Sequence, residues 1–271
     1  MRVQHSRADH IGLADQLPLA GLRDDVLGGA FLELLAVAGR EQRKDVEKTA
    51  LDGLVVVAES QTEGRGRLGR AWYSPPETGI YLSVLLKPQL EPSHFSLFTL
   101  LSGVAAVLTI NEFSHKRANL KWPNDILIQG KKVCGLLCEL IQNRGKFSGL
   151  IIGFGINANH LAEQFPEDLK NIATSLRIVN GLPIDRLAVI RSLLMNLDRE
   201  YQTYLNKGRR SVIEKWSLNT DLFGKKVSIN RGSTIITGTA MQLNESGQLV
   251  LRRDNGHEEI FDSGEVTLHT N

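Results

Sequence analysis

Apolar residues recur along the chain with two spacings, one typical of strands and one typical of helices. Short runs that are rich in β-branched residues, or that alternate between apolar and polar positions, predict strands. Four regions have this character: 54–60, 80–86, 126–140 and 149–159. The third of them contains a Gln129–Gly130 pair that suits a hairpin turn, so we expect two strands there.

Three other stretches have the spacing of a helix. Residues 183–207 place apolar side chains every three or four positions, with an aspartate in the first turn and a glycine after the end. Residues 95–110 are almost entirely apolar but shorter than the ~20 residues of a membrane span. We therefore expect a core helix, which begins near Pro92 and Ser93. A shorter apolar run, 32–38, also fits a helix.

The pattern changes after Trp216, where short alternating runs are separated by the turn clusters NRGS, NESG, RDNG and DSGE. Such spacing predicts a small antiparallel barrel. The 271 residues are enough for one large domain and one small one, and no Pro/Gly-rich linker separates them. We therefore expect a mixed α/β domain at 1–215, with a barrel at 216–271 packed against it.

The composition argues against several classes of protein. A hydrophobic fraction of 42% and a charged fraction of 23% are those of an ordinary globular protein. The net charge of +2 argues against a general polyanion binder, and the arginines lack the interleaved aromatic residues of an RNA-binding surface. Cys134 and Cys138 lie too close along one strand to bridge, so we expect reduced core residues. The N-terminus lacks the apolar segment of a secretory signal, and we expect a cytoplasmic protein without membrane contact.

The most unusual stretch is GRGRLGR at residues 64–70, directly after the first strand region. Glycine lets the backbone come close to a ligand, and arginine offers a planar set of donors that suits carboxylate and phosphate groups. Together they predict an anion-binding loop, although composition alone leaves a solvated surface loop open. Three glycines are costly to order and three arginines repel one another, so we expect the loop to close on an anion.

A second candidate is the stretch KWPND, which ends at Asp125. Its proline and the two residues after it favour a turn, so that Asn124 and Asp125 stand at the start of the next strand. Across the expected hairpin, Lys132 begins a strand and Gly135 leaves room for a ligand. Ordinary interpretations stay open as well, because Asn and Asp form turns, most lysines are solvated, and Trp72 would by default be core.

Taken in order, four motifs resemble those of the biotin protein ligases. They are GRGRLGRAW preceded by ESQT, then KWPND, KKVCGLLCE and GFGINAN, with ATSL following at residues 173–176. The similarity covers roughly residue 54 to the C-terminus and leaves 1–50 as a divergent part of the first domain. The resemblance implies an α/β (α+β) fold, with a class II synthetase-like catalytic domain built on a mixed sheet and an SH3-like small β-barrel after it.

The resemblance also implies an ATP-dependent enzyme, a biotin–[biotin carboxyl-carrier protein] ligase. Biotin and ATP would give biotinyl-5′-AMP, and biotin would then pass to a lysine of a biotin carboxyl carrier protein, with Mg²⁺ assisting. Positioned cations that hold a carboxylate and a phosphate together would reduce their repulsion. The segment before the first helix is too short for a DNA-binding winged helix, so we expect no DNA partner, and the protein would be a monomer or homodimer.

Three groups of site residues are carried over by the resemblance. Lys132, Arg67 and Asp125 would carry the chemistry, with Asp125 orienting Lys132 or contacting magnesium. The biotin-binding residues implied are Gln61, Gly64, Arg65, Gly66, Arg67, Lys132 and Gly135. The ATP-binding residues implied are Arg67, Arg70, Trp72, Asn124, Lys132 and Asn157.

One departure from the family concerns the biotin pocket. Family members usually carry Ser-Thr-Asn at the start of an upstream helix, and the corresponding residues here are Gly28, Gly29 and Ala30. Losing a buried hydrogen bond to a substrate costs ~1 kcal/mol. Two interpretations therefore stand beside an active ligase. One is a non-catalytic homologue that binds biotin or its adenylate, and the other is a lipoate-type ligase, against which the GRGRLGRAW loop argues.

Overall fold

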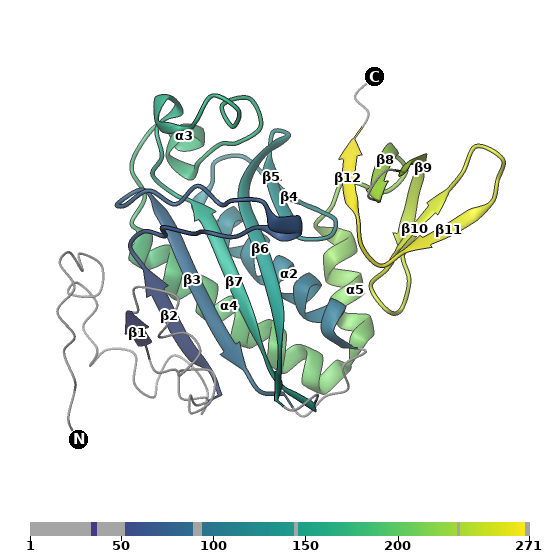
Figure 1. Ribbon diagram of the computed structural model, residues 1–271, viewed down its shortest axis with the longest axis horizontal. Coiled ribbons are helices and arrows are strands. Elements are labelled where there is room, and N and C mark those ends of the chain that lie inside the picture. Colours follow the sequence, from purple (N-terminus) through teal and green to yellow (C-terminus); the bar gives the residue numbers. More distant parts are fainter. Residues whose placement is uncertain (1–33, 37–51, 89–93, 144–145, 232–233, 269–271) are drawn as a thin grey trace.

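The structure, a computed structural model, describes residues 34–36, 52–88, 94–143, 146–231 and 234–268. These residues form one sheet of seven strands and one of five. Figure 1 shows the large sheet with helices behind it and the small sheet to one side.

The large sheet has the strand order β1-β2-β3-β7-β6-β5-β4. Only β1 and β2 pair in parallel, whereas every other neighbouring pair is antiparallel. Hairpins join β4 to β5, β5 to β6 and β6 to β7. The predicted turn at Gln129–Gly130 joins β5 to β6, and both of its residues have positive φ. The strands are β1 (Leu34–Ala36), β2 (Leu54–Ala58), β3 (Gly79–Leu86), β4 (Ala118–Lys121), β5 (Asp125–Ile128), β6 (Lys131–Asn143) and β7 (Lys146–Asn157).

Helices cover one face of this sheet. The apolar helix α2 (Phe95–Phe113) packs against β4, β5 and β6 on one side and against α4 (Arg186–Lys207) and α5 (Arg209–Leu218) on the other. Length and composition alone would let α2 cross a membrane, but 67% of its apolar window is buried inside the protein, as expected of a core helix. Asp185 caps α4 by accepting from two backbone N–H groups, which explains where that helix begins.

The small sheet is antiparallel, in the order β11-β10-β9-β8-β12. Its apolar residues belong to the same buried cluster as those of α2, so the two sheets share one core. At the junction the indole Nε1 of Trp122 donates to the carbonyl of Gly247 (3.3 Å). The strands are β8 (Lys226–Arg231), β9 (Thr234–Leu243), β10 (Leu249–Arg252), β11 (Glu258–Phe261) and β12 (Glu265–Leu268).

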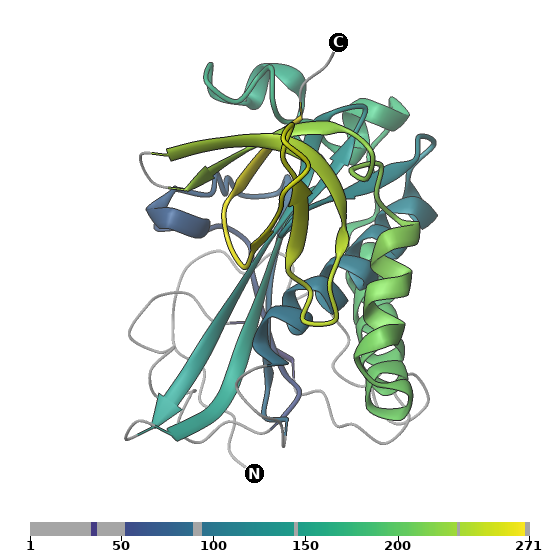
Figure 2. The ribbon, with the colours of Figure 1, turned by 90° about the vertical axis from the view of Figure 1, so that its right-hand side faces the viewer.

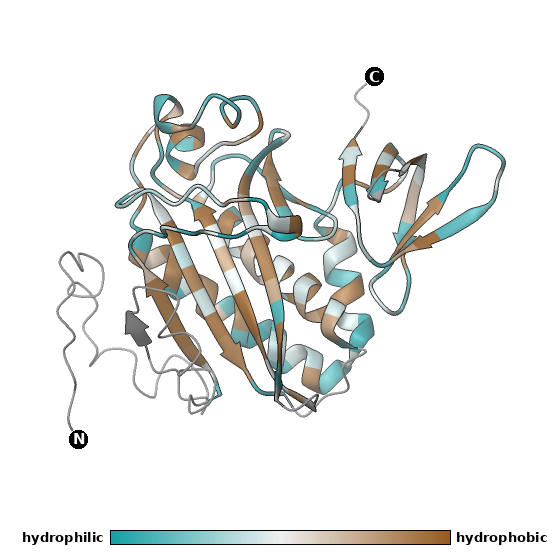
Figure 3. Ribbon diagram, in the orientation of Figure 1, coloured by the Kyte–Doolittle hydropathy of each residue, from teal (hydrophilic) through white to brown (hydrophobic). Residues whose placement is uncertain are grey.

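Most predicted elements are present, including the strands around GRGRLGR and KWPND and the core helix. Figure 3 shows brown, apolar residues along the strands of the large sheet. The predicted helix at 32–38 is wrong, because Leu34–Ala36 forms β1. Its backbone pairs with Val55 to Val57 in β2, and hydrogen bonds at a sheet edge outweigh a helical preference over so few residues. Ser93 and the stretch 28–30 lie outside the described residues, and His94 is the N-cap of α2.

Candidate active site

The face of the large sheet that points away from the helices carries the candidate site. Alternation along β3 places Ile80, Leu82 and Val84 in the core, whereas Tyr81 and Ser83 face a cavity of about 990 Å³. Figure 2 shows the helices on one side of the sheet and the Gly/Arg loop on the other. The open face, defined here as the face lined by this cavity, is therefore bounded by that loop, the KWPND turn and β12.

Glycines form the floor of the cavity. Gly135 in β6 pairs directly with Gly155 in β7, and the indole of Trp72 lies over both. A Cβ on Gly155 would lie 2.5 Å from Trp72 Cε2, and one on Gly135 would lie 2.9 Å from Trp72 Cζ3. Side chains at these two positions would therefore displace the tryptophan.

A β-bulge brings Lys132 onto the open face. Between Ile126 and Leu127 the pairing of β5 with β6 shifts, so that Ile126 faces Cys134 whereas Leu127 faces Lys132. Strict alternation would place Lys132 and Gly135, three residues apart, on opposite faces. Because the bulge adds one residue to β6 between these pairs, Lys132 and Gly135 lie on the same face. A Cβ on Gly135 would accordingly lie 3.0 Å from Lys132 Cε.

Lys132 has two partners across the cavity. Its Nζ lies 2.6 Å from Oδ1 of Asp125 and 5.2 Å from the centroid of the Trp72 ring. Both side chains of the ion pair are only partly exposed, so their attraction is less screened than that of a surface pair. The ammonium group is thus held beside the glycine floor.

The Gly/Arg loop is a hairpin that crosses this floor. Gly66 N–H donates to the carbonyl of Arg70 (2.7 Å), and Trp72 N–H donates to that of Gly64 (2.8 Å). The tip is a short 3-10 helix, η1 (Arg67–Gly69), in which Leu68 is left-handed at φ 56°. The base of the loop is therefore held by two backbone hydrogen bonds.

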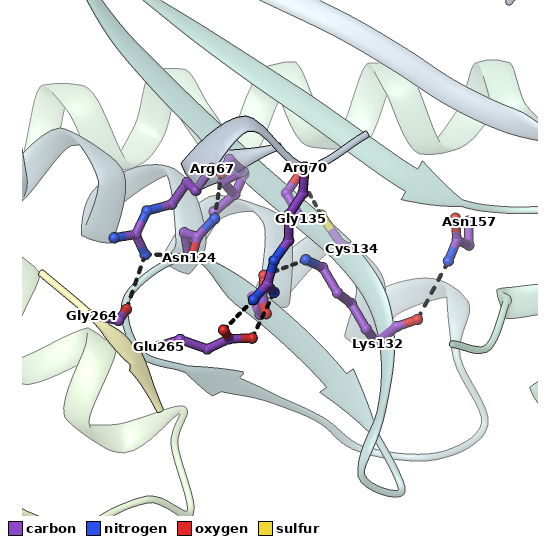
Figure 4. A network of polar contacts seen from close by, with 11 residues as sticks. Arg67, Arg70, Asn124, Lys132, Cys134, Gly135, Asn157, Gly264 and Glu265 are labelled. Atoms are coloured by element: carbon purple, nitrogen blue, oxygen red, sulfur yellow. Dashed lines mark hydrogen bonds and ion pairs between the residues drawn. The ribbon is translucent and has the colours of Figure 1, made fainter. Parts of the chain in front are cut away.

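Arg67 and Arg70 reach from this loop to the small sheet (Figure 4). Arg67 Nη1 donates to Oδ1 of Asn124 (3.1 Å) and to the carbonyl of Gly264 (3.4 Å). Arg70 forms a bidentate pair with Glu265, whose Oε1 lies 2.6 Å from Nη1. Burial lowers the pKa of Arg67, partly offset by nearby carboxylates, whereas the hydrogen bond with Glu265 raises that of Arg70. The same bond lowers the pKa of the Glu265 carboxyl.

Two asparagines hold backbone around the cavity. Asn157 is 4% exposed and its Nδ2 donates to the carbonyls of Thr174 (3.0 Å) and Lys132 (3.4 Å). Asn124 Nδ2 donates to the carbonyl of Leu136 (2.6 Å). Both side chains line the cavity and bond to the backbone of β6, the strand that carries Lys132.

The structure brings almost all sequence-predicted site residues to this cavity. All of them line it except Gly64, where an added Cβ would lie within 3 Å of the side chains of Gln61 and Ser74. Arg65 lines it from an isolated bridge to Ala71. No three His, Cys, Asp or Glu side chains in the described ranges are grouped so as to hold a metal ion.

Sequence reasoning missed Gly155 and Glu265. A glycine inside a strand signals a close approach, so the GFGIN run could have indicated Gly155. Glu265 gives no such signal, because its partner Arg70 lies 195 residues away.

The chain matches two family models. That described as the biotin/lipoate A/B protein ligase family matches residues 40–157, and that of the biotin protein ligase C-terminal domain matches residues 222–268. Both models describe protein ligases, the first for biotin or lipoate and the second for biotin.

Individual relatives narrow the class. The bifunctional ligase/repressor BirA of Bacillus subtilis is 33% identical over 92% of this chain and 77% of its own length. The biotin–[acetyl-CoA-carboxylase] ligase of Mycobacterium tuberculosis is 27% identical over 95% of this chain and 98% of its own. The structure of the Aquifex aeolicus biotin protein ligase in complex with biotin and ATP aligns with a TM-score of 0.76 at 31% identity, covering 89% of this chain and 99% of that one. The chain belongs to the biotin protein ligase family and is a ligase.

Proposed function

We propose that this chain uses ATP to form biotinyl-5′-AMP in the cavity on the open face and transfers biotin to a lysine of a biotin carboxyl carrier protein. The observation that carries the proposal is the gathering of Lys132, Arg67 and Arg70 around a glycine floor. The Aquifex aeolicus structure with biotin and ATP supports both substrates.

The residues have roles that fit this reaction. A carboxylate attacks the α-phosphate of ATP, so two anions must approach each other and charge builds up at phosphorus. Lys132, beside the floor, reaches the carboxylate and α-phosphate oxygens, and Arg67 from the loop neutralises the same charge. Both nucleophiles, the biotin carboxylate and the acceptor amine, come from the substrates, so no nucleophilic side chain is required.

Biotin and ATP occupy different parts of the cavity in this proposal. Gln61, the loop backbone from Arg65 to Arg67 and Gly135 contact biotin. Arg70, Trp72, Asn124 and Asn157 form the nucleotide side. The buried Nε1 of Trp72 has no hydrogen-bond partner among the described residues.

A magnesium ion fits the donors on this side. Asp125 supplies a carboxylate in the cavity, and Mg²⁺ is commonly bound by one or two carboxylates together with substrate phosphates. When bound with ATP, the ion neutralises phosphate charge. In this proposal Asp125 either orients Lys132, to which it is paired, or would contact the metal.

The catalytic domain extends to residue 215, and residues 216–271 form an SH3-like domain that supplies Gly264 and Glu265 to the edge of the cavity. The helix α5 crosses that boundary. We place the protein in the cytoplasm.

The test is incubation with biotin, ATP, Mg²⁺ and a biotin carrier domain. We expect the mass of the acceptor to rise by one biotinyl group at its lysine, and biotinyl-5′-AMP to form when the acceptor is left out. If biotin binds but no adenylate forms, the chain is a binding protein. If lipoate is transferred in preference to biotin, the assignment of the substrate is wrong.

A further inference from the structure

A stretch of chain outside the strands of the large sheet holds the backbone of Lys132. Along β6, pairing with β7 begins only at Cys134, which lies opposite Ile156. Two residues earlier, Lys132 forms an isolated parallel bridge with Ala173 instead. We call residues 172–176 the bridging segment. It takes the place of β7 beside the lysine, because β5 occupies the other edge of β6 there.

Two backbone hydrogen bonds join the bridging segment to the lysine. Lys132 N–H donates to the carbonyl of Ile172 (2.7 Å), and the N–H of Thr174 donates to the carbonyl of Lys132 (2.9 Å). On its other edge Lys132 pairs with Leu127, at the bulge where the register of β5 and β6 shifts. Since a bulge disrupts the ladder locally, the place of the lysine backbone depends strongly on the bridging segment.

The side chain of Ser175 anchors the bridging segment to the chain that follows β7. It is 0% exposed, and its hydroxyl donates to the carbonyl of His160 (2.7 Å) and accepts from the N–H of Ile178 (3.0 Å). The hydroxyl hydrogen is thus used on His160 and a lone pair on Ile178. Nearby, the N–H of Arg177 donates to the carbonyl of Ala158 (2.9 Å).

Ser175 lies behind the cavity and not in its wall. Ile172 and Ala173 line the cavity beside Lys132, whereas Ser175 is absent from the lining. The serine is therefore connected to the reacting groups only through the backbone of the bridging segment.

We infer that Ser175 is a positioning residue, whose hydrogen bond with His160 holds the bridging segment and thereby sets the place of the Lys132 ammonium group in the cavity. The inference rests on the proposed function, in which that group acts on the carboxylate and the α-phosphate. A cation accelerates such a reaction only when it is held where negative charge develops. The ion pair with Asp125 keeps the ammonium in the cavity, so loss of the serine hydroxyl should lower the rate without abolishing it.

A double-mutant cycle tests the inference, because residues that act through one another are not additive. The rate of adenylate formation is measured for the full chain and for Ser175→Ala, Lys132→Ala and the double variant. We expect Ser175→Ala to lower kcat about tenfold, with KM for biotin and ATP nearly unchanged. In the Lys132→Ala background the same substitution should have no further effect.

Asp185→Ala is the matched control for the loss of a helix cap. Ser175 is the N-cap of α3 (Leu176–Asn180) and Asp185 that of α4, and both side chains accept from backbone N–H groups. Asp185 does not line the cavity. Both variants should lose stability in denaturant titration, but only Ser175→Ala should lower kcat.

Amide hydrogen exchange at Lys132 gives a second readout, which does not depend on activity. This N–H donates to the carbonyl of Ile172, so it reports directly on the bridging segment. Ser175→Ala should make the amide of Lys132 exchange severalfold faster, whereas Asp185→Ala should leave its exchange as in the wild type.

The outcomes separate the inference from the proposed function. Equal losses from Ser175→Ala in both backgrounds, or unchanged exchange at Lys132, would overturn the positioning role while leaving the ligase intact. No adenylate from the wild-type chain would remove the proposed function, and exchange at Lys132 would still show whether Ser175 holds its backbone. Ser175→Cys, similar in shape but a weaker donor, carries the same measurements should the alanine variant not fold.

Discussion

Along β3 and β7, neighbouring residues point to opposite faces of the large sheet and meet different surroundings. On the helix-covered face, Ile152 and Phe154 are almost fully buried in the main core. On the open face, the residues between and after them are Gly153 and Gly155, which line the cavity. The same strands thus supply stability on one side and space for a ligand on the other.

The open face tolerates several charged side chains because the apolar core lies on the other face of the sheet. The apolar core lies behind the sheet, so the open face can omit side chains at the glycines and hold Lys132 and Asp125 as a partly exposed pair. Burying such charges in the core would carry a large desolvation cost. We therefore expect substitutions on the two faces to have separable effects on stability and on activity.

The largest effects on activity and on stability should come from replacing one residue on each face by alanine. Lys132→Ala should lower the rate of adenylate formation at least a hundredfold, about 3 kcal/mol, with little change in unfolding. Ile152→Ala should lower the free energy of unfolding by about 2–5 kcal/mol, with near-normal activity in the folded fraction. Denaturant titration and an adenylate assay measure both. Lys131→Ala, at a neighbouring exposed lysine, is the control. Wild-type activity in Lys132→Ala would make that lysine a surface residue.

A buried histidine beside the open face should make stability depend on pH. His160 is 0% exposed, stacks on Phe165, and has no hydrogen-bond partner for either ring nitrogen among the described residues. Burial lowers its pKa from 6.5 to about 4. Between these values the unfolded chain binds a proton and the folded chain does not, so stability falls as the pH falls, by about 3 kcal/mol in total.

The variant His160→Phe isolates this contribution, because a phenyl ring can stack on Phe165 and does not titrate. Unfolding curves at pH 7 and pH 4 should show a smaller acid-induced loss in the variant than in the wild type. Identical losses in both proteins would mean that His160 gains a partner or water in solution.

A smaller effect should distinguish two glycines of the open face. Gly155→Ala would drive a Cβ into Trp72, whereas Gly153→Ala would place one 3.4 Å from the carbonyl of Leu137, an ordinary contact. We expect Gly155→Ala to shift tryptophan emission and to slow adenylate formation about tenfold, or ~1.4 kcal/mol. The emission of Gly153→Ala should match the wild type. Unchanged emission in both variants would show that Trp72 does not rest on the glycine floor.

The smallest effect should come from the contact between the loop and the small sheet. Arg70 is 63% exposed, so its pair with Glu265 should contribute less than ~1 kcal/mol. Because the pKa of Glu265 is lowered by Arg70, the contribution exists above pH 4.5 and disappears as the carboxyl is protonated in acid. Glu265→Gln should therefore be slightly less stable than the wild type at pH 7 and equal to it at pH 3. A difference that persists at pH 3 would point to packing instead.

The local sequence determined most of the elements. Short apolar runs, either rich in β-branched residues or alternating with polar ones, predicted β2, β3, β5, β6 and β7. The longer apolar stretch predicted α2. The helix predicted at 32–38 is wrong, because so short a run carries too little periodicity to distinguish a helix from a strand. Within it, Leu34–Ala36 pair with the edge of β2. The motifs also identified most of the residues that line the cavity.

How those residues meet depends on contacts between segments far apart in the chain. Sequence alternation would separate Lys132 from Gly135, and the bulge opposite Ile126 and Leu127 brings both to the open face. Likewise, no local pattern links Arg70 to Glu265, because the small sheet must first dock on α2 before its edge reaches the loop. Periodicity is a property of neighbours along the chain, whereas register shifts and docking depend on how many hydrogen bonds and how much apolar burial the whole fold gains.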